Sequence, residues 1–84
     1  METIAIDISE SVFNKDTEAI LYVTKDDEVE PAQYIFAIPV ITFSWCAYDE
    51  KDLESFFPHS ILGNKDKENK LLNEMKKALN KFNV

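Results

Sequence analysis

The stretch QYIFAIPVITFSWCA, from Gln33 to Ala47, decides the fold class of this chain, because its large apolar residues recur with a period of two. The positions that share one face are Tyr34, Phe36 and Ile38 before Pro39, and Ile41, Phe43 and Trp45 after it. Proline cannot donate a ladder hydrogen bond, so Pro39 marks an edge, a bulge or a break. No turn signal such as Asn-Gly stands there. We therefore expect one bent strand or a bent or bulged pair of strands, rather than a tight hairpin.

Two further strands are expected upstream of this stretch. Isoleucines alternate with other residues from Ile4 to Ile8, which is typical of a half-buried strand. The segment from Ala19 to Thr24 is rich in β-branched and aromatic residues, and a charged cluster ends it. Between the two strands lies a polar connection, in which we expect Val12 and Phe13 to reach the core.

Two helices are expected after the strands. Asp49 is suited to be the N-cap of a short helix that runs through Phe57. Gly63, the only glycine, predicts a backbone conformation with positive φ. A second helix then begins near Asn64 or Asp66. Its apolar residues fall on one stripe at helical spacing: Leu71, Leu72, Met75, Ala78, Leu79 and Phe82.

The order of these elements, strands first and helices last, predicts an α+β domain. We expect a small, mostly antiparallel sheet of three to four strands, with the short helix and the longer C-terminal amphipathic helix on one face. With 84 residues, the chain has room for one core, so residues 1–84 are expected to form a single domain.

The residues needed for common catalytic and metal sites are scarce. Cys46 is the only cysteine, which excludes an intramolecular disulfide, and its apolar surroundings predict burial. His59 is the only histidine and stands next to Ser60 in a turn, where we expect it at the surface rather than in catalysis. One glycine cannot build a phosphate-binding loop. We therefore expect no enzymatic activity, no cofactor and no designed metal site.

Negative charge is concentrated in the first part of the chain. Through residue 54 there are thirteen acids and three lysines, a balance of −10, whereas the remainder has six lysines and three acids, a balance of +3. The whole chain has a net charge of −7 and contains no arginine. Such a charge repels nucleic acid and membrane phosphates and attracts basic protein surfaces.

The acids that we expect to contact a partner form two groups. The groups are Asp26, Asp27, Glu28 and Glu30 in a loop, and Asp49, Glu50, Asp52 and Glu54 in the short helix. Carboxylates three or four residues apart on a helix lie roughly 5–6 Å from one another. If the two groups are adjacent, their charge density approaches that of duplex DNA, about one charge per 1.7 Å. Trp45 and Tyr48 would supply apolar anchors, although the competing interpretation, a place in the core, is the one that the sequence favours for Trp45.

In size and charge the chain resembles bacteriocin or toxin immunity proteins and phage-encoded inhibitors of host nucleases. That resemblance implies an acidic DNA-mimic inhibitor of a basic nuclease or DNA-binding protein, with no direct contact to nucleic acid or membrane. The absence of arginine and the abundance of lysine, asparagine and isoleucine are typical of AT-rich coding, as in a low-GC bacterium or a phage. We expect a cytoplasmic location, in the host cytoplasm if a phage encodes the protein. The alternative is a small structural or regulatory protein whose acidity serves only solubility. Such a protein could be a homodimer.

Overall fold

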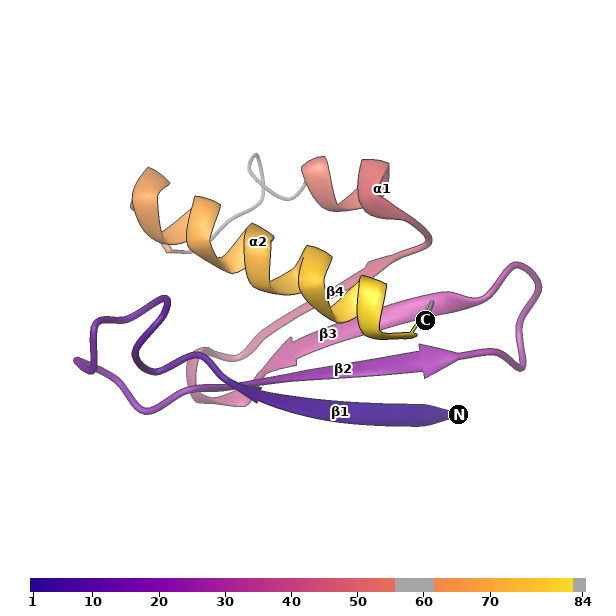
Figure 1. The fold of residues 1–84 in the computed structure, drawn as a ribbon, viewed down its shortest axis with the longest axis horizontal. Helices are drawn as coiled ribbons and strands as arrows, with labels where there is room; N and C mark the ends of the chain where they lie inside the picture. The colour runs from indigo at the N-terminus through magenta and orange to yellow at the C-terminus, as the bar shows by residue number, and fades with distance from the viewer. Residues whose placement is uncertain (56–61, 83–84) are drawn as a thin grey trace.

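A computed structural model describes residues 1–55 and 62–82 and shows a four-stranded antiparallel sheet with two helices on one of its faces (Figure 1). The strands follow the sheet order β1-β2-β3-β4, so each strand pairs with the next one in the chain. Their bounds are β1 Glu2–Asp7, β2 Ile20–Asp26, β3 Gln33–Ile38 and β4 Phe43–Ala47. The helices are η1 Pro39–Ile41, a single 3-10 turn, α1 Glu50–Glu54 and α2 Lys65–Phe82. The α+β class expected from the order of the elements is confirmed.

The period of two in each strand separates a buried face from an exposed one. In the row Ile4–Val23–Phe36–Trp45, all side chains face the helices, and Val23 and Phe36 are completely buried. The neighbouring row Ala5–Tyr22–Ala37–Ser44 lies on the opposite face, where Tyr22 is 42% exposed.

The long helix α2 covers the middle of the sheet, as Figure 1 shows. Asn64 begins it as the N-cap, because its Oδ1 accepts hydrogen bonds from the N–H groups of Asp66 (2.9 Å) and Lys67 (3.2 Å). Gly63 has a φ of +66°, which confirms the expected conformation. Five residues of the expected apolar stripe are buried, and the sixth, Phe82, packs at its edge with its ring 5.8 Å from that of Tyr34. No helix in the described ranges is long and apolar enough to cross a membrane.

The first helix is shorter than the sequence predicted. It ends at Glu54, and Ser55 forms its C-cap with a backbone N–H that bonds to the carbonyl of Asp52. Ser55 Oγ also donates to the same carbonyl at 2.6 Å, which terminates the helical hydrogen-bond ladder there. Phe57, the predicted last helical residue, lies outside the described residues.

The expectation of a bent or bulged pair at Pro39 was wrong, because β3 and β4 form a hairpin. Pro39 begins the 3-10 turn η1, where its missing N–H leaves no hydrogen bond unmade. Thr42 then takes a left-handed conformation with φ +52°, and its N–H donates to the Pro39 carbonyl at 3.0 Å. A β-branched residue is uncommon in that conformation, so the turn carried no recognisable sequence signal.

The expected burial of Cys46 was also wrong, since this residue is exposed. In β4 it lies between Trp45 and Ala47, whose side chains face the helices, so its own side chain points to the other face. The connection between β1 and β2 did place Val12 and Phe13 in the core, where they are 0% and 6% exposed.

Candidate functional site

The two predicted groups of acids lie at the same end of the sheet, which we call the acidic end. It comprises the loop acids Asp26, Asp27, Glu28 and Glu30 and the helix acids Asp49, Glu50, Asp52 and Glu54. The register explains the placement, because Asp26 pairs with Gln33 and the next residue of β3, Tyr34, pairs with Ala47 at the end of β4. The end of β4, where the chain leaves for α1, therefore lies about two strand spacings, roughly 10 Å, from the end of β2, where the β2–β3 loop begins. In Figure 1 the β2–β3 loop forms the right-hand end of the molecule, and α1 lies above the sheet, right of the centre.

At the β2–β3 turn, the carboxylate of Asp26 shapes the backbone and others remain available for contacts; Asp26, which was expected in the loop, is the last residue of β2 and pairs with Gln33. Asp26 Oδ1 accepts a hydrogen bond from the Glu28 N–H at 3.1 Å, which forms a local turn. Asp27 lies 3.4 Å from the amino group of Met1, with both groups about half exposed. The carboxylates of Glu28 and Glu30 are exposed and make no hydrogen bond or ion pair with the described residues. These two charges are therefore available to a partner.

In α1, three of the four acids have structural contacts. Asp49 is the N-cap and accepts from the Asp52 N–H at 3.0 Å, while Asp52 Oδ2 accepts from the Tyr48 N–H at 2.8 Å. These two bonds tie the first turn of the helix to the residues that precede it. Glu54 lies 4.0 Å from Lys76 of α2, a long and exposed ion pair of little energetic weight. The side chain of Glu50 is exposed and makes no hydrogen bond or ion pair with the described residues.

The two predicted aromatic anchors have different environments. Tyr48 is 51% exposed and directly precedes the N-cap Asp49, and its backbone N–H donates to Asp52 Oδ2. Trp45 is partly buried on the helix-facing side of β4 and packs against the core. Tyr48 therefore offers a partner more apolar surface than Trp45 does.

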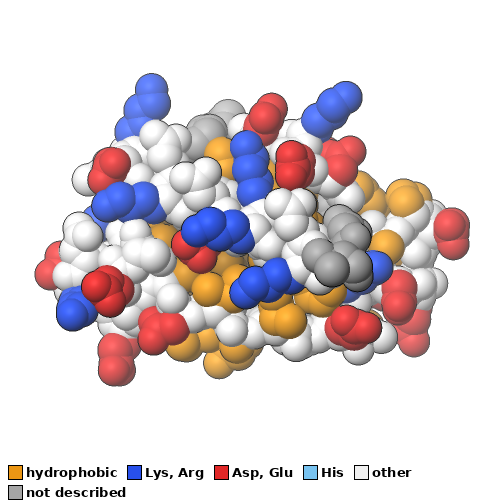
Figure 2. Space-filling view, viewed as in Figure 1, with side chains coloured by type: hydrophobic (Ala, Val, Ile, Leu, Met, Phe, Trp, Pro, Cys, Tyr) orange, Lys and Arg blue, Asp and Glu red, His pale blue; other side chains and the backbone are white. Residues whose placement is uncertain are grey.

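Acids also gather at the opposite end of the molecule, a feature that the sequence reasoning missed. Glu10, Asp16 and Glu18 belong to the connection between β1 and β2, and all three are exposed. Figure 2 shows lysines along α2 in the middle of this face and acids toward both ends. The order of the strands could have predicted this second group, because antiparallel strands place consecutive loops at opposite ends of the sheet.

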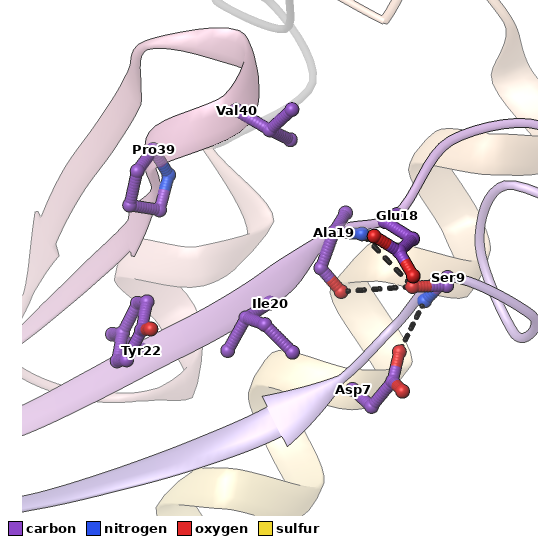
Figure 3. A pocket seen from close by; sticks show the side chains of 8 residues that line it. All are labelled: Asp7, Ser9, Glu18, Ala19, Ile20, Tyr22, Pro39 and Val40. Atoms are coloured by element: carbon purple, nitrogen blue, oxygen red, sulfur yellow. Dashed lines mark hydrogen bonds between the residues drawn. The ribbon is translucent and has the colours of Figure 1, made fainter.

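A shallow depression of about 380 Å³ lies at that second end, on the sheet face away from the helices (Figure 3). It is lined by Asp7, Ser9, Glu18, Ala19, Ile20, Tyr22, Pro39 and Val40. Ser9 connects the end of β1 to the start of β2 beside this depression. Its Oγ accepts a hydrogen bond from the Ala19 N–H at 2.8 Å, and its N–H donates to Asp7 Oδ1 at 2.9 Å. The Ser9 hydroxyl and backbone N–H together lower the pKa of Asp7 below its ordinary value.

The described ranges contain no cluster of three or more histidine, cysteine, aspartate or glutamate side chains with the geometry of a metal site. His59 and Ser60 lie outside the described residues. Chemically, the acidic end presents exposed carboxylates and an exposed tyrosine, groups that can contact lysine and arginine side chains.

Comparisons with protein-family models, with curated proteins and with solved structures gave no match to this chain.

Proposed function

We propose that this protein is a non-enzymatic acidic binding protein that inhibits or neutralises a basic protein that handles nucleic acid, such as a nuclease or a DNA-binding protein. The observation that carries the proposal is the adjacency of two acidic segments at one end of the sheet. Together the two segments place eight acids at one end of the sheet, where the ends of β2 and β4 are about two strand spacings, roughly 10 Å, apart, and this concentration of negative charge is what a basic, nucleic-acid-binding surface attracts.

The acids of this surface divide into those that bind and those that hold the surface in shape. Three of the acids are exposed and make no side-chain hydrogen bond or ion pair with the described residues: Glu28, Glu30 and Glu50. They therefore supply the charge most available to arginine and lysine. Asp26, Asp49 and Asp52 accept backbone hydrogen bonds, which fixes the loop and the helix entry. Prior fixing of this kind reduces the entropy lost on binding. Tyr48, next to the N-cap of α1, adds an exposed ring.

The test uses two triple variants with the same change in net charge. The first, Glu28→Lys, Glu30→Lys and Glu50→Lys, reverses the available charges of the acidic end. The control, Glu10→Lys, Asp16→Lys and Glu18→Lys, reverses three exposed charges at the other end. Both variants change the net charge from −7 to −1. Binding is measured by calorimetry against a panel of purified nucleases with basic clefts, at low and high salt.

We expect the wild type to bind at least one member of the panel, with an affinity that falls as salt rises. The acidic-end variant should lose at least about a hundredfold in affinity, whereas the control variant should lose less than about tenfold. Equal losses in the two variants would show that net charge, and not this surface, governs the interaction, and would refute the proposal.

A second candidate function is a structural or regulatory protein whose acidity serves only solubility. The observation that favours it is the presence of acids at both ends of the molecule, which is typical of a charged coat without a dedicated face (Figure 2). In that case, no member of the panel binds and both triple variants become less soluble to the same degree.

A further inference from the structure

The outer edge of β1 carries backbone groups that have no partner among the described residues. Just beyond β1, the Ile8 N–H donates to the carbonyl of Ala19, the residue before β2, at 3.0 Å, so the N–H of Ile8 points toward the β2 side. Hydrogen-bonded pairs alternate along an antiparallel ladder. Ile6 and Ile4 therefore also bond to β2, while the N–H and C=O groups of Thr3, Ala5 and Asp7 point away from the sheet.

The side chains support this assignment. Thr3 and Thr24 are directly opposite each other, and their Oγ1 atoms are only 2.9 Å apart. Side chains approach most closely in the non-hydrogen-bonded pairs of an antiparallel ladder. The backbone groups of Thr3 therefore face outward, as the position of Ile8 predicts.

Nothing in the sequence of β1 protects this edge. Sheet edges are usually blocked by lysine, proline, a bulge or a charge within the strand. β1 contains no lysine or proline, its register with β2 is continuous, and its two acids stand at its first and last positions. On the helix-facing side, Ile4 and Ile6 are only partly buried, which leaves apolar surface beside the free edge.

We propose that β1 pairs antiparallel with β1 of a second copy of this chain, across a two-fold axis at Ala5, to form a continuous eight-stranded sheet. Residues opposite each other must point to the same face, so the axis has to pass through a residue and not between two. An axis at Ala5 pairs Ala5 with Ala5 and Thr3 with Asp7 of the second copy, and these pairs share six backbone hydrogen bonds. An axis at Ile4 aligns only Thr3 with Ala5 and gives four.

The same register is favourable for the side chains. Ile4 lies opposite Ile6 of the second copy on the helix-facing side, where both become more buried. Thr3 lies opposite Asp7 on the other face, and no two acids are directly opposite each other. Because the strands are antiparallel, the two acidic ends lie at opposite ends of the double sheet, so each remains open to a partner. This dimer does not depend on the proposed function.

Charge sets the expected strength and salt dependence of the dimer. In this dimer, the first residue of β1 in one copy, Glu2, lies near the end of β1 in the other copy, where Asp7 and Glu18 are located. Like charges therefore approach one another. Salt screens this repulsion and should strengthen the dimer, whereas it should weaken binding to a basic partner. The interface is small, so we expect a dissociation constant between about 1 µM and 1 mM.

The experiment is sedimentation equilibrium of the whole chain over a concentration series up to about 1 mM, the weakest affinity considered, at low and high salt. The mass should rise from 9.7 kDa toward twice that value. Ala5→Pro removes the outward N–H at the axis without breaking a bond to β2, and should weaken association about tenfold or more. Hydrogen exchange of Thr3, Ala5 and Asp7 should slow as the concentration rises.

A charge pair at the axis keeps the test decisive if the proline variant does not fold. Ala5→Lys and Ala5→Glu should each be monomeric, because each places like charges face to face, and an equimolar mixture of the two should form the heterodimer. Ser44→Lys is the matched control, since Ser44 is exposed in the same cross-strand row but on β4, and it should leave association unchanged. A wild type that stays at 9.7 kDa at about 1 mM, or a mixture that fails to associate, would overturn the proposal.

Discussion

The side chain of Cys46 lies on the sheet face away from the helices, because its neighbours Trp45 and Ala47 face the core. An apolar run does not by itself bury every residue in it, since a strand turns alternate side chains to opposite faces. The environment of a single residue in this sheet is thus set by its parity in the strand.

We expect Cys46 to react with a thiol reagent in the folded protein nearly as fast as in denaturant, since the residue is exposed. Cys46→Ser should change the free energy of unfolding by less than about 0.5 kcal/mol. An absorbance assay of thiol release and a urea titration measure the two effects. A reaction slowed a hundredfold by folding would contradict the exposed position.

Ser9→Ala should lower the free energy of unfolding by about 1 kcal/mol, because the Ala19 N–H loses its acceptor. It should also raise the pKa of Asp7, which Ser9 holds below its ordinary value. A lowered pKa in the folded state contributes stability above the pKa of the unfolded chain, and this contribution is lost as pH falls through the folded pKa. The variant should therefore lose less stability on acidification than the wild type. Urea titrations across that pH range, with an NMR titration of the Asp7 carboxyl carbon, check both effects.

At the scale of the elements, the short connections decide where the acidic end is built. The hairpin at η1 reverses β3 into β4, and this reversal returns the chain to the end of the sheet that carries the β2–β3 loop. Without it, the helix acids would leave from the other end and the two groups would be separated.

Thr42→Gly should raise the free energy of unfolding by about 0.5 kcal/mol, since the left-handed conformation at φ +52° costs a β-branched residue more than it costs glycine. Thr24→Gly, within β2, is the control and should be destabilising by about 1 kcal/mol. Thermal unfolding of both variants measures the difference. Destabilisation by the Thr42 substitution would contradict the strained turn.

The first helix depends on its cap more than on its length. Asp49→Ala should cost about 1 kcal/mol because the Asp52 N–H loses its acceptor, whereas Asp49→Asn should cost only a few tenths. Urea titrations of the two variants separate the capping bond from the charge. Equal costs would mean that the charge of Asp49, and not its hydrogen bond, stabilises α1.

At the scale of the whole molecule, the net charge of −7 is spread over two acidic ends with lysines between them (Figure 2). The lysines of α2 are distributed along the whole helix, and some pair with acids, as Lys70 does with Asp66 at 3.2 Å. Such exposed pairs contribute little, so repulsion between like charges opposes folding.

We expect added salt to stabilise the isolated protein at pH 7, by an amount on the order of 1 kcal/mol, or about 4–8 °C in Tm. The two triple lysine variants, with a net charge of −1, should respond less. Calorimetry at a concentration below that at which the chain associates measures the effect. A Tm that falls with salt would show that the ion pairs outweigh the repulsion.

The sequence by itself determined the elements that repeat a simple pattern. The period of two indicated the first strand and the stretch from Gln33 to Ala47, and β-branched and aromatic content indicated the second strand. The stripe from Leu71 to Phe82 indicated the long helix, since burial of an apolar face leaves a periodic trace in the sequence. Only the tertiary structure decided the hairpin at Pro39, the exposure of Cys46 and the adjacency of the loop acids and helix acids. These features depend on which strand pairs with which and in what register, and charged side chains in loops carry no periodic record of their neighbours.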